Sequence, residues 1–195
     1  MLAAVILSGG ASSRMGSPKA LLPYQGRPFL EHLLEVTARP EIGVRRVVLG
    51  ADAEPIAKAI DLKADEIVIN PDWEKGQLSS IHAAVRSLPA GTDGMLLCLI
   101  DHPLISRPLV GELIEHFYKS GKLIALPVYE ARRGHPVIFS ASLYEELLRA
   151  PLETGARAVV WAHASDVEEV PTNEEGCVLN LNDPDTMNRA ISGVG

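Results

Sequence analysis

Short apolar runs recur along the chain, and amphipathic stretches separate them. A run that is apolar at every position, and not only at alternate ones, is typical of a strand buried on both faces of a sheet. The sequence has such runs at residues 2–7, 47–49, 67–69, 95–100, 123–128 and 137–139. We therefore expect a buried strand at each of them.

Helical periodicity fills several of the intervals. Pro28 begins one amphipathic stretch, and Ser106 is placed to cap another that has Pro108 in its first turn. Two more stretches cover residues 79–88 and 142–149. Strands that alternate with helices of this length predict an α/β fold with a single doubly wound, mostly parallel sheet.

Composition and charge narrow the class of protein. The 195 residues are 47% hydrophobic and 22% charged, which excludes a disordered chain or a coiled coil, and we expect one domain over residues 1–195. A net charge of −7 argues against a nucleic-acid partner, and the apolar runs are too short to cross a membrane. Cys98 and Cys177 form no CxxC pair, so we expect two reduced, buried thiols in a cytoplasmic protein.

The segment after the first apolar run carries the clearest candidate chemistry. Residues 7–19 read LSGGASSRMGSPK and include three glycines and the cations Arg14 and Lys19. Glycines let a backbone approach a ligand closely, successive N–H groups attract an anion, and both cations suit phosphate oxygens. The segment is neither a Walker A loop nor a dinucleotide fingerprint. The residues alone therefore leave two interpretations, a phosphate-binding loop or a solvated loop.

The spacing of this segment resembles the signature LxGGxSxRMG, followed by lysine, of the nucleotidyltransferases that act on molybdenum cofactor, the MobA-like NTP transferases. Further segments resemble the same family: GQLSSI from residue 76, LIDHPL from 99, RGHPVIF from 133, GAR from 155 and NLNDP from 180. The likeness covers nearly the whole chain, and the RGHP and GAR segments favour the cytidylyltransferase branch over the guanylyltransferase branch. It implies a nucleotide-diphospho-sugar transferase-like, Rossmann-like fold. It also implies Mg²⁺-dependent transfer of CMP from CTP to the phosphate of molybdenum cofactor, with release of pyrophosphate.

The resemblance implies roles for residues on the nucleotide side. Lys19 would neutralise charge on the α-phosphate, and Arg14 would hold the β- and γ-phosphates. Ser79 and Ser80 would lie beside the base and ribose, although one of them could simply be a helix N-cap. The implied nucleotide-binding set is Leu7, Ser8, Gly9, Gly10, Arg14, Lys19, Ser79 and Ser80.

The implied metal site involves two segments. Asp101 follows an apolar run and would act in catalysis with Lys19 and Arg14 by binding Mg²⁺, a hard cation that suits carboxylate and triphosphate oxygens. Asn182 would be the second ligand, although an Asx turn before Pro184 is the alternative. Asn180 and Asn182 stand where the family has aspartates, which weakens the case for this second ligand.

On the acceptor side, the resemblance implies that His135, Arg133 and Arg157 bind the molybdopterin-type acceptor. The alternatives are a structural histidine and two solvated cations. We expect His102 to serve a turn, and Trp73 and Trp161 to be packing residues, with stacking platforms as the alternative. The family also implies a molybdoenzyme or its chaperone as a protein partner.

Gly9 leaves the choice of nucleotide open. Cytidylyltransferases of this type usually have alanine there and guanylyltransferases have glycine, and a missing Cβ beside the base would leave room for a purine. GTP-dependent guanylyl transfer is therefore the first alternative. The others are a nucleotidyltransferase for another phosphate acceptor and a non-catalytic carrier of the cofactor.

Overall fold

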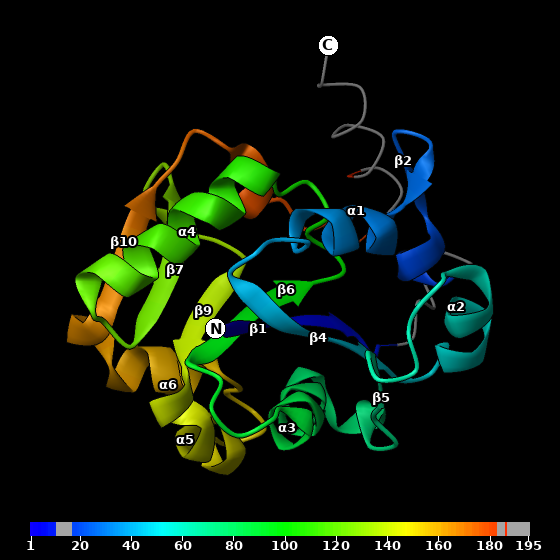
Figure 1. Cartoon of the computed structure of the whole chain (residues 1–195), viewed down its shortest axis with the longest axis horizontal. Coiled ribbons are helices and arrows are strands. Elements are labelled where there is room, and N and C mark those ends of the chain that lie inside the picture. The colour runs from blue at the N-terminus through cyan, green and yellow to red at the C-terminus, as the bar shows by residue number, and fades with distance from the viewer. Residues whose placement is uncertain (11–16, 183–185, 187–195) are drawn as a thin grey trace.

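The computed structural model describes residues 1–10, 17–182 and 186. Its centre is a sheet whose strands follow the order β10-β7-β9-β6-β1-β4-β5 (Figure 1). Along this path the pairing is parallel except at β9, which runs antiparallel to both β6 and β7. The bounds are β1 Leu2–Ser8, β4 Ile42–Leu49, β5 Ile67–Ile69, β6 Gly94–Leu99, β7 Ile124–Tyr129, β9 Val137–Ser140 and β10 Val167–Pro171. The predicted mostly parallel sheet is confirmed.

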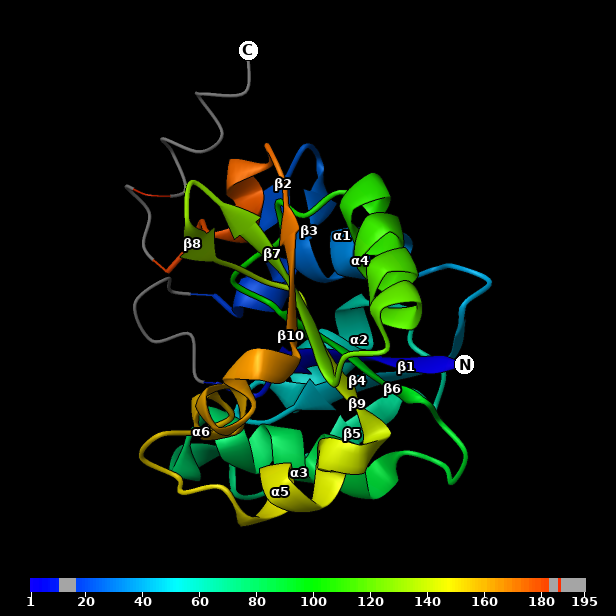
Figure 2. The same cartoon turned by 90° about the vertical axis from the view of Figure 1, so that its left-hand side faces the viewer.

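Helices cover both faces of this sheet. Figures 1 and 2 show α1 (Phe29–Val36) and α4 (Arg107–Ser120) on one side, and α3 (Gln77–Ser87), α5 (Tyr144–Arg149) and α6 (Arg157–Ala162) on the other. Successive side chains of a strand point to opposite faces. Leu2 and Ile6 of β1 accordingly pack in the cluster of α1 and α4, whereas Val5 and Leu7 pack in the cluster of α3 and α5. Both faces of β1 are therefore shielded from water, as its uninterrupted apolar run requires.

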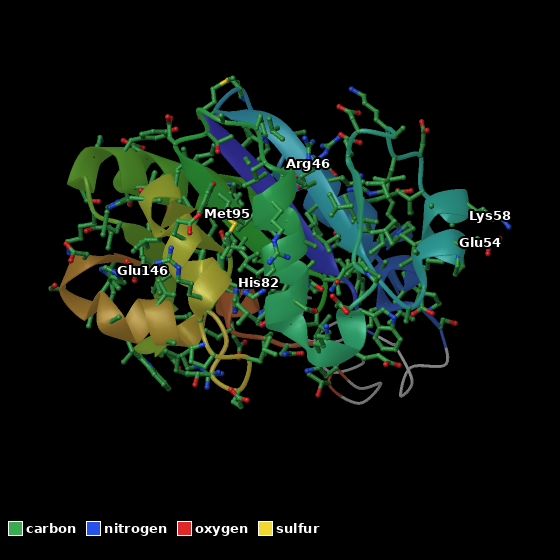
Figure 3. All side chains as sticks on the ribbon, turned by 90° about the horizontal axis from the view of Figure 1, so that it is seen from below. Arg46, Glu54, Lys58, His82, Met95 and Glu146 are labelled. Carbon is green, nitrogen blue, oxygen red and sulfur yellow. The ribbon has the colours of Figure 1, made fainter. Side chains whose placement is uncertain are left out.

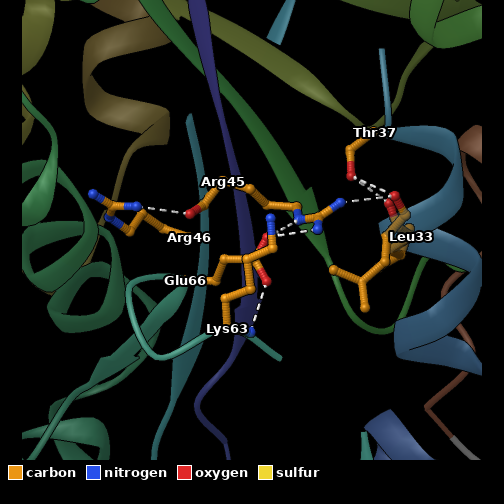
Figure 4. A network of polar contacts seen from close by, with 7 residues as sticks. Leu33, Thr37, Arg45, Arg46, Lys63 and Glu66 are labelled. Atoms are coloured by element: carbon orange, nitrogen blue, oxygen red, sulfur yellow. Dashed lines mark hydrogen bonds and ion pairs between the residues drawn. The ribbon is translucent and has the colours of Figure 1, made fainter. Parts of the chain in front are cut away.

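The predicted helix starts agree with the structure. Helix α1 begins directly after Pro28, and the Ser106 side chain caps α4 by accepting a hydrogen bond from the backbone N–H of Leu109. The last carbonyls of α1 are also satisfied. Thr37 Oγ1 donates to the carbonyl of Leu33 at 2.7 Å, and Arg45, which pairs with Glu66 at 2.6 Å, donates to that of Leu34 (Figure 4).

Several elements were not anticipated from the sequence. They are α2 (Ala53–Ala59), the hairpin of β2 (Pro23–Tyr24) and β3 (Arg27–Pro28), β8 (Arg132–Arg133), α6 and β10. Among the described strands, β10 pairs with β7 alone, and its VEEVP sequence carries a half-buried Glu168, an exposed Glu169 and a terminal proline. Such a sequence is typical of an edge strand, so it lacks the continuous apolar run that marks the buried strands.

A side-chain contact joins two of the helices on one face of the sheet. His82 of α3, which Figure 3 labels, contacts the carbonyl of Leu147 in α5 at 3.0 Å. Cys98 and Cys177 are free and buried as predicted, and burial raises their thiol pKa values to about 12 and about 11.

In the described part of the chain, no helix is both long and apolar enough to cross a membrane.

Candidate active site

A cavity of about 210 Å³ lies at the carboxyl ends of β1 and β6, where doubly wound sheets bind ligands. We call it the donor cavity. Asp101, just after β6, lines it together with Gln77 at the start of α3. Of the predicted nucleotide-binding residues, the lining includes Leu7, Ser8, Gly9, Gly10, Lys19 and Ser80. The structure thus gathers segments that are far apart in the sequence, while Arg14 lies outside the described residues.

Gly9 is tightly enclosed by its neighbours. A Cβ built at this position would lie 2.6 Å from Oγ of Ser80, which is itself buried. On the other side, the carbonyl of Gly9 accepts a hydrogen bond from the N–H of Ala51 at 3.3 Å. The absence of a side chain at position 9 is therefore explained by the Ser80 hydroxyl.

The two adjacent serines have different surroundings. The single O–H of Ser79 points between two carbonyl oxygens, that of Gly76 at 2.7 Å and that of Asp72 at 2.9 Å, and Ser79 does not line the donor cavity. Asn70 Nδ2 donates to both hydroxyls, at 2.9 Å to Ser79 and 3.0 Å to Ser80. Gly76 is the N-cap of α3, so neither serine is that cap. Ser79 therefore supports the start of the helix, and Ser80 alone faces the donor cavity.

Lys19 joins the glycine-rich segment to the C-terminal segment. It begins a short 3-10 helix, Lys19–Leu21, and its ammonium group donates a hydrogen bond to Oδ1 of Asn182. The adjacent Leu181 donates its backbone N–H to the carbonyl of Asp101 at 2.8 Å. Lys19, Asp101 and Asn182 are thereby held at one edge of the sheet, as the predicted set requires.

Two histidine rings lie next to one another beyond Asp101. The rings of His102 and His135 have centroids 4.9 Å apart, and the Nδ1 atom of each is buried without a hydrogen-bond partner among the described residues. Burial lowers the pKa of His135 to about 3, and the nearby His102 ring acts in the same direction. Burial also lowers the pKa of His102, although the Asp101 carboxylate opposes this. Both rings are therefore neutral at neutral pH.

A second cavity, of about 320 Å³, brings the three predicted acceptor residues together. Arg133, His135 and Arg157 all line it, and we call it the acceptor cavity. Gln77 lines both cavities, so the two adjoin at the start of α3. One side of the acceptor cavity is apolar and comes from the sheet, through Leu97, Leu126, Val137 and Phe139.

The RGHP segment is held in place by close backbone packing. A Cβ at Gly134 would lie 2.6 Å from the carbonyl of Cys177, and the N–H of His135 donates to that same carbonyl at 2.8 Å. Arg133 is paired with Glu169 at 2.7 Å. The glycine therefore allows the chain to pass close to residue 177, and this contact sets where His135 enters the cavity.

The lining residues that sequence reasoning missed include four with large polar or aromatic side chains. Asp52 and Trp73 line the donor cavity, Gln77 lines both cavities, and Trp161 lines the acceptor cavity. Gln77 lies inside the GQLSSI segment and could have been found from it. The prediction that Trp161 is a packing residue is wrong, because 61% of this residue is exposed.

Comparisons with known proteins bear on the family and the fold of the chain. A nicotine blue oxidoreductase from Paenarthrobacter nicotinovorans is 34% identical over 71% of each chain, and a molybdenum cofactor guanylyltransferase from Rhizobium meliloti is 29% identical over 96% of this chain and 89% of its own. A crystal structure of Rv0371c from Mycobacterium tuberculosis is 27% identical, with a TM-score of 0.84 over 99% of both chains. The MobA-like NTP transferase domain matches residues 4–167. The chain therefore belongs to the family of MobA-like NTP transferases and is a nucleotidyltransferase.

Proposed function

We propose that the chain transfers CMP from CTP to the phosphate of molybdenum cofactor and releases pyrophosphate. The observation that carries this proposal is the pair of adjoining cavities. One is lined by the glycine segment, Lys19 and Asp101, and the other by Arg133, His135 and Arg157. A transferase of this kind must hold a triphosphate and a second phosphate side by side, and the two cavities share Gln77.

The chemistry needs alignment and charge stabilisation more than proton transfer. A phosphate monoester is largely dianionic at neutral pH, so its oxygen can attack the α-phosphorus while the bond to the pyrophosphate oxygen breaks. Both histidines have lowered pKa values and need not act as bases. The task of Lys19 is to neutralise the charge that develops on the α-phosphate, and its bond to Asn182 holds it at the cavity edge.

The side chains of the donor cavity do not complete a divalent-metal site by themselves, so triphosphate oxygens would have to supply further ligands. Within the part of the chain that the structure describes, no group of three or more His, Cys, Asp or Glu side chains could hold a metal ion. Asp101 offers a carboxylate, and Asn182 offers an amide oxygen that also accepts from Lys19. Mg²⁺ commonly binds through one or two carboxylates together with substrate phosphates. A bound Mg²⁺ would neutralise triphosphate charge, and a structure of the mycobacterial relative was solved with manganese.

The packing of Gly9 removes the reason that the glycine alone would give for preferring GTP. The Ser80 hydroxyl takes up the space that a side chain at position 9 would fill, so the glycine adds no room for a purine.

Pyrophosphate release with CTP, GTP, ATP and UTP, each with purified molybdenum cofactor and Mg²⁺, tests the choice of nucleotide. Release with CTP supports the proposal, whereas release with GTP alone overturns the choice of base but keeps the transferase.

A redox reaction is the second candidate function, because one relative is named as an oxidoreductase and matches 71% of this chain at 34% identity. Hydride transfer from a reduced nicotinamide cofactor to an added quinone-type dye, catalysed by the purified chain and with no pyrophosphate released from any nucleotide, would favour it. Pyrophosphate release that depends on the acceptor would exclude it as the main activity.

A further inference from the structure

Asp52 lines the donor cavity, and its carboxylate has no task in the phosphate chemistry described above. The residue is the N-cap of α2, a position where aspartate normally accepts a hydrogen bond from a backbone N–H of the first turn. Its side chain makes no such bond, and within residues 1–10, 17–182 and 186 the carboxylate has neither a hydrogen-bond nor an ion-pair partner. A half-buried carboxylate that lines a cavity and does not cap its helix is available to a ligand.

The order of the strands places Asp52 away from the reacting end of the cavity. Strands β6, β1 and β4 are neighbours in this order, and Asp101 follows β6 whereas Asp52 follows β4 (Figure 1). Adjacent strands lie about 4.8 Å apart, so two spacings separate the ends of β6 and β4 by roughly 10 Å. This exceeds the reach from an α-phosphate to the hydroxyls of its own ribose and matches the reach to the far edge of the base.

The surroundings of Asp52 suit the uncharged part of a nucleotide. Like charges repel, so an unpaired carboxylate disfavours a triphosphate beside it. Ile56, one turn further along α2, and Trp73, which follows β5, line the cavity on this side. Trp73 packs closely here, because a Cβ at Gly50 would lie 2.7 Å from the Cβ of Trp73. Apolar and aromatic side chains around one polar group are the usual lining for a ring that is recognised at its edge.

We propose that Asp52 determines the base specificity of the donor cavity by accepting a hydrogen bond from the exocyclic amino group of cytosine. This inference rests on the proposed function and names the residue that selects its nucleotide. A carboxylate only accepts hydrogen bonds, and position 4 of cytosine carries an N–H donor where uracil carries a carbonyl oxygen. Cytosine therefore gains a charge-assisted hydrogen bond, whereas uracil would bring two acceptors together with no proton between them.

Binding of nucleotides without the acceptor tests this assignment. CTP, UTP and dCTP are titrated calorimetrically with Mg²⁺ into the wild-type chain and into the Asp52→Asn variant. The wild type should bind CTP at least about tenfold more tightly than UTP, which is the scale of one hydrogen bond to a charged group. In Asp52→Asn this preference should fall to within about threefold, because the amide can turn and donate to the uracil oxygen. The ligand dCTP keeps the base and should behave like CTP.

The variant Glu54→Gln is the matched control for the lost charge. Glu54 lies in the first turn of the same helix, pairs with Lys58 on an exposed face and does not line the donor cavity. Its substitution removes a negative charge two residues from Asp52 and should leave the preference for CTP unchanged. An equal fall in preference in Glu54→Gln would overturn the assignment, since it would show a general effect of charge.

The contradicting results separate this inference from the proposed function. If the wild type binds CTP and UTP equally, or if Asp52→Asn weakens both alike, the carboxylate does not select the base and the inference is overturned. If CTP loses affinity in the variant but dCTP does not, the partner is the ribose and the inference is again overturned. Each of these results keeps the transferase, provided that the wild-type chain releases pyrophosphate with molybdenum cofactor. A preference for CTP that depends on Asp52, with no release from any nucleotide, keeps the inference and overturns the proposed transfer.

Discussion

Ser80 occupies the space beside Gly9. Its hydroxyl would lie 2.6 Å from a Cβ at position 9, and it is held there by a hydrogen bond of 3.0 Å from Asn70 Nδ2. The two positions therefore form a matched pair, in which a glycine accommodates a serine. The residue at position 9 must therefore be interpreted together with the residue at position 80.

Substitution Gly9→Ala should destabilise the protein and should be relieved by a second change. Overpacking of a buried site costs about 1–3 kcal/mol, and we expect Gly9→Ala to fall in the lower half of that range because Ser80 can rotate. Ser80→Ala removes the clashing oxygen and leaves a Cβ that lies 3.7 Å from the new methyl group. Urea unfolding of both single variants and the double variant gives the coupling. Strictly additive free energies would show that the two positions are independent.

Loss of the Lys19 ammonium should slow transfer. We expect Lys19→Ala to lower the rate of pyrophosphate release by about 10²–10³, the usual scale for removing one donor that stabilises transition-state charge. Lys58→Ala is the matched control, because Lys58 pairs with Glu54 on an exposed face of α2 (Figure 3). A loss of less than tenfold at Lys19, measured where chemistry limits the rate, would remove it from the mechanism.

Removal of the Asp101 carboxylate should weaken metal binding in the presence of nucleotide. Asp101→Asn keeps the shape of the side chain but loses its charge, so Mn²⁺ titrated into the chain with CTP should bind at least tenfold more weakly. Asp61→Asn changes an exposed acid elsewhere and should have no effect. The alternative carboxylate in the donor cavity is Asp52. Unchanged binding in Asp101→Asn together with a loss in Asp52→Asn would move the metal to Asp52.

Burial of neutral His135 should make the protein less stable in mild acid. Its pKa falls from about 6.5 in the unfolded chain to about 3 in the folded one, so between these values the unfolded chain binds one more proton. The contribution to stability is present above pH 6.5 and is lost as pH falls, by about 2 kcal/mol between pH 7 and pH 5. His102 shifts in the same direction and adds to the slope.

The variant His135→Gln tests this dependence, because it removes the titrating ring. Its free energy of unfolding, from urea titrations at pH 7 and pH 5, should change less with pH than that of the wild type. Parallel pH profiles for the two proteins would show that His135 is not buried as the neutral form.

The buried strands and the helix starts could be predicted from the sequence because short stretches of residues indicate them. The apolar run of β1 and the cap at Ser106 can each be recognised from a few adjacent residues. Strand β10 was missed because an edge strand with one partner needs no continuous apolar run. Helix α6 was missed because its length is six residues, too short for a clear helical period.

Which site residues lie close together depends on the topology and packing of the chain, so the sequence alone does not show it. The resemblance supplied Arg133, His135 and Arg157, and the structure places all three on one cavity. The exposure of Trp161 and the inward position of Ser80 are set by how α6 and α3 meet the sheet. No single-sequence pattern distinguishes Ser79, which supports the helix start, from Ser80, which faces the donor cavity.

Pyrophosphate release that depends on both nucleotide and acceptor tests the central claim most directly. Purified chain, CTP and Mg²⁺ are incubated with and without molybdenum cofactor, with the Lys19→Ala variant alongside. The account predicts release only when the acceptor is present, one pyrophosphate for each cytidine dinucleotide formed, and at least a hundredfold slower release in the variant. Bound nucleotide and bound cofactor with no release from the wild-type chain would contradict it and would identify the protein as a carrier.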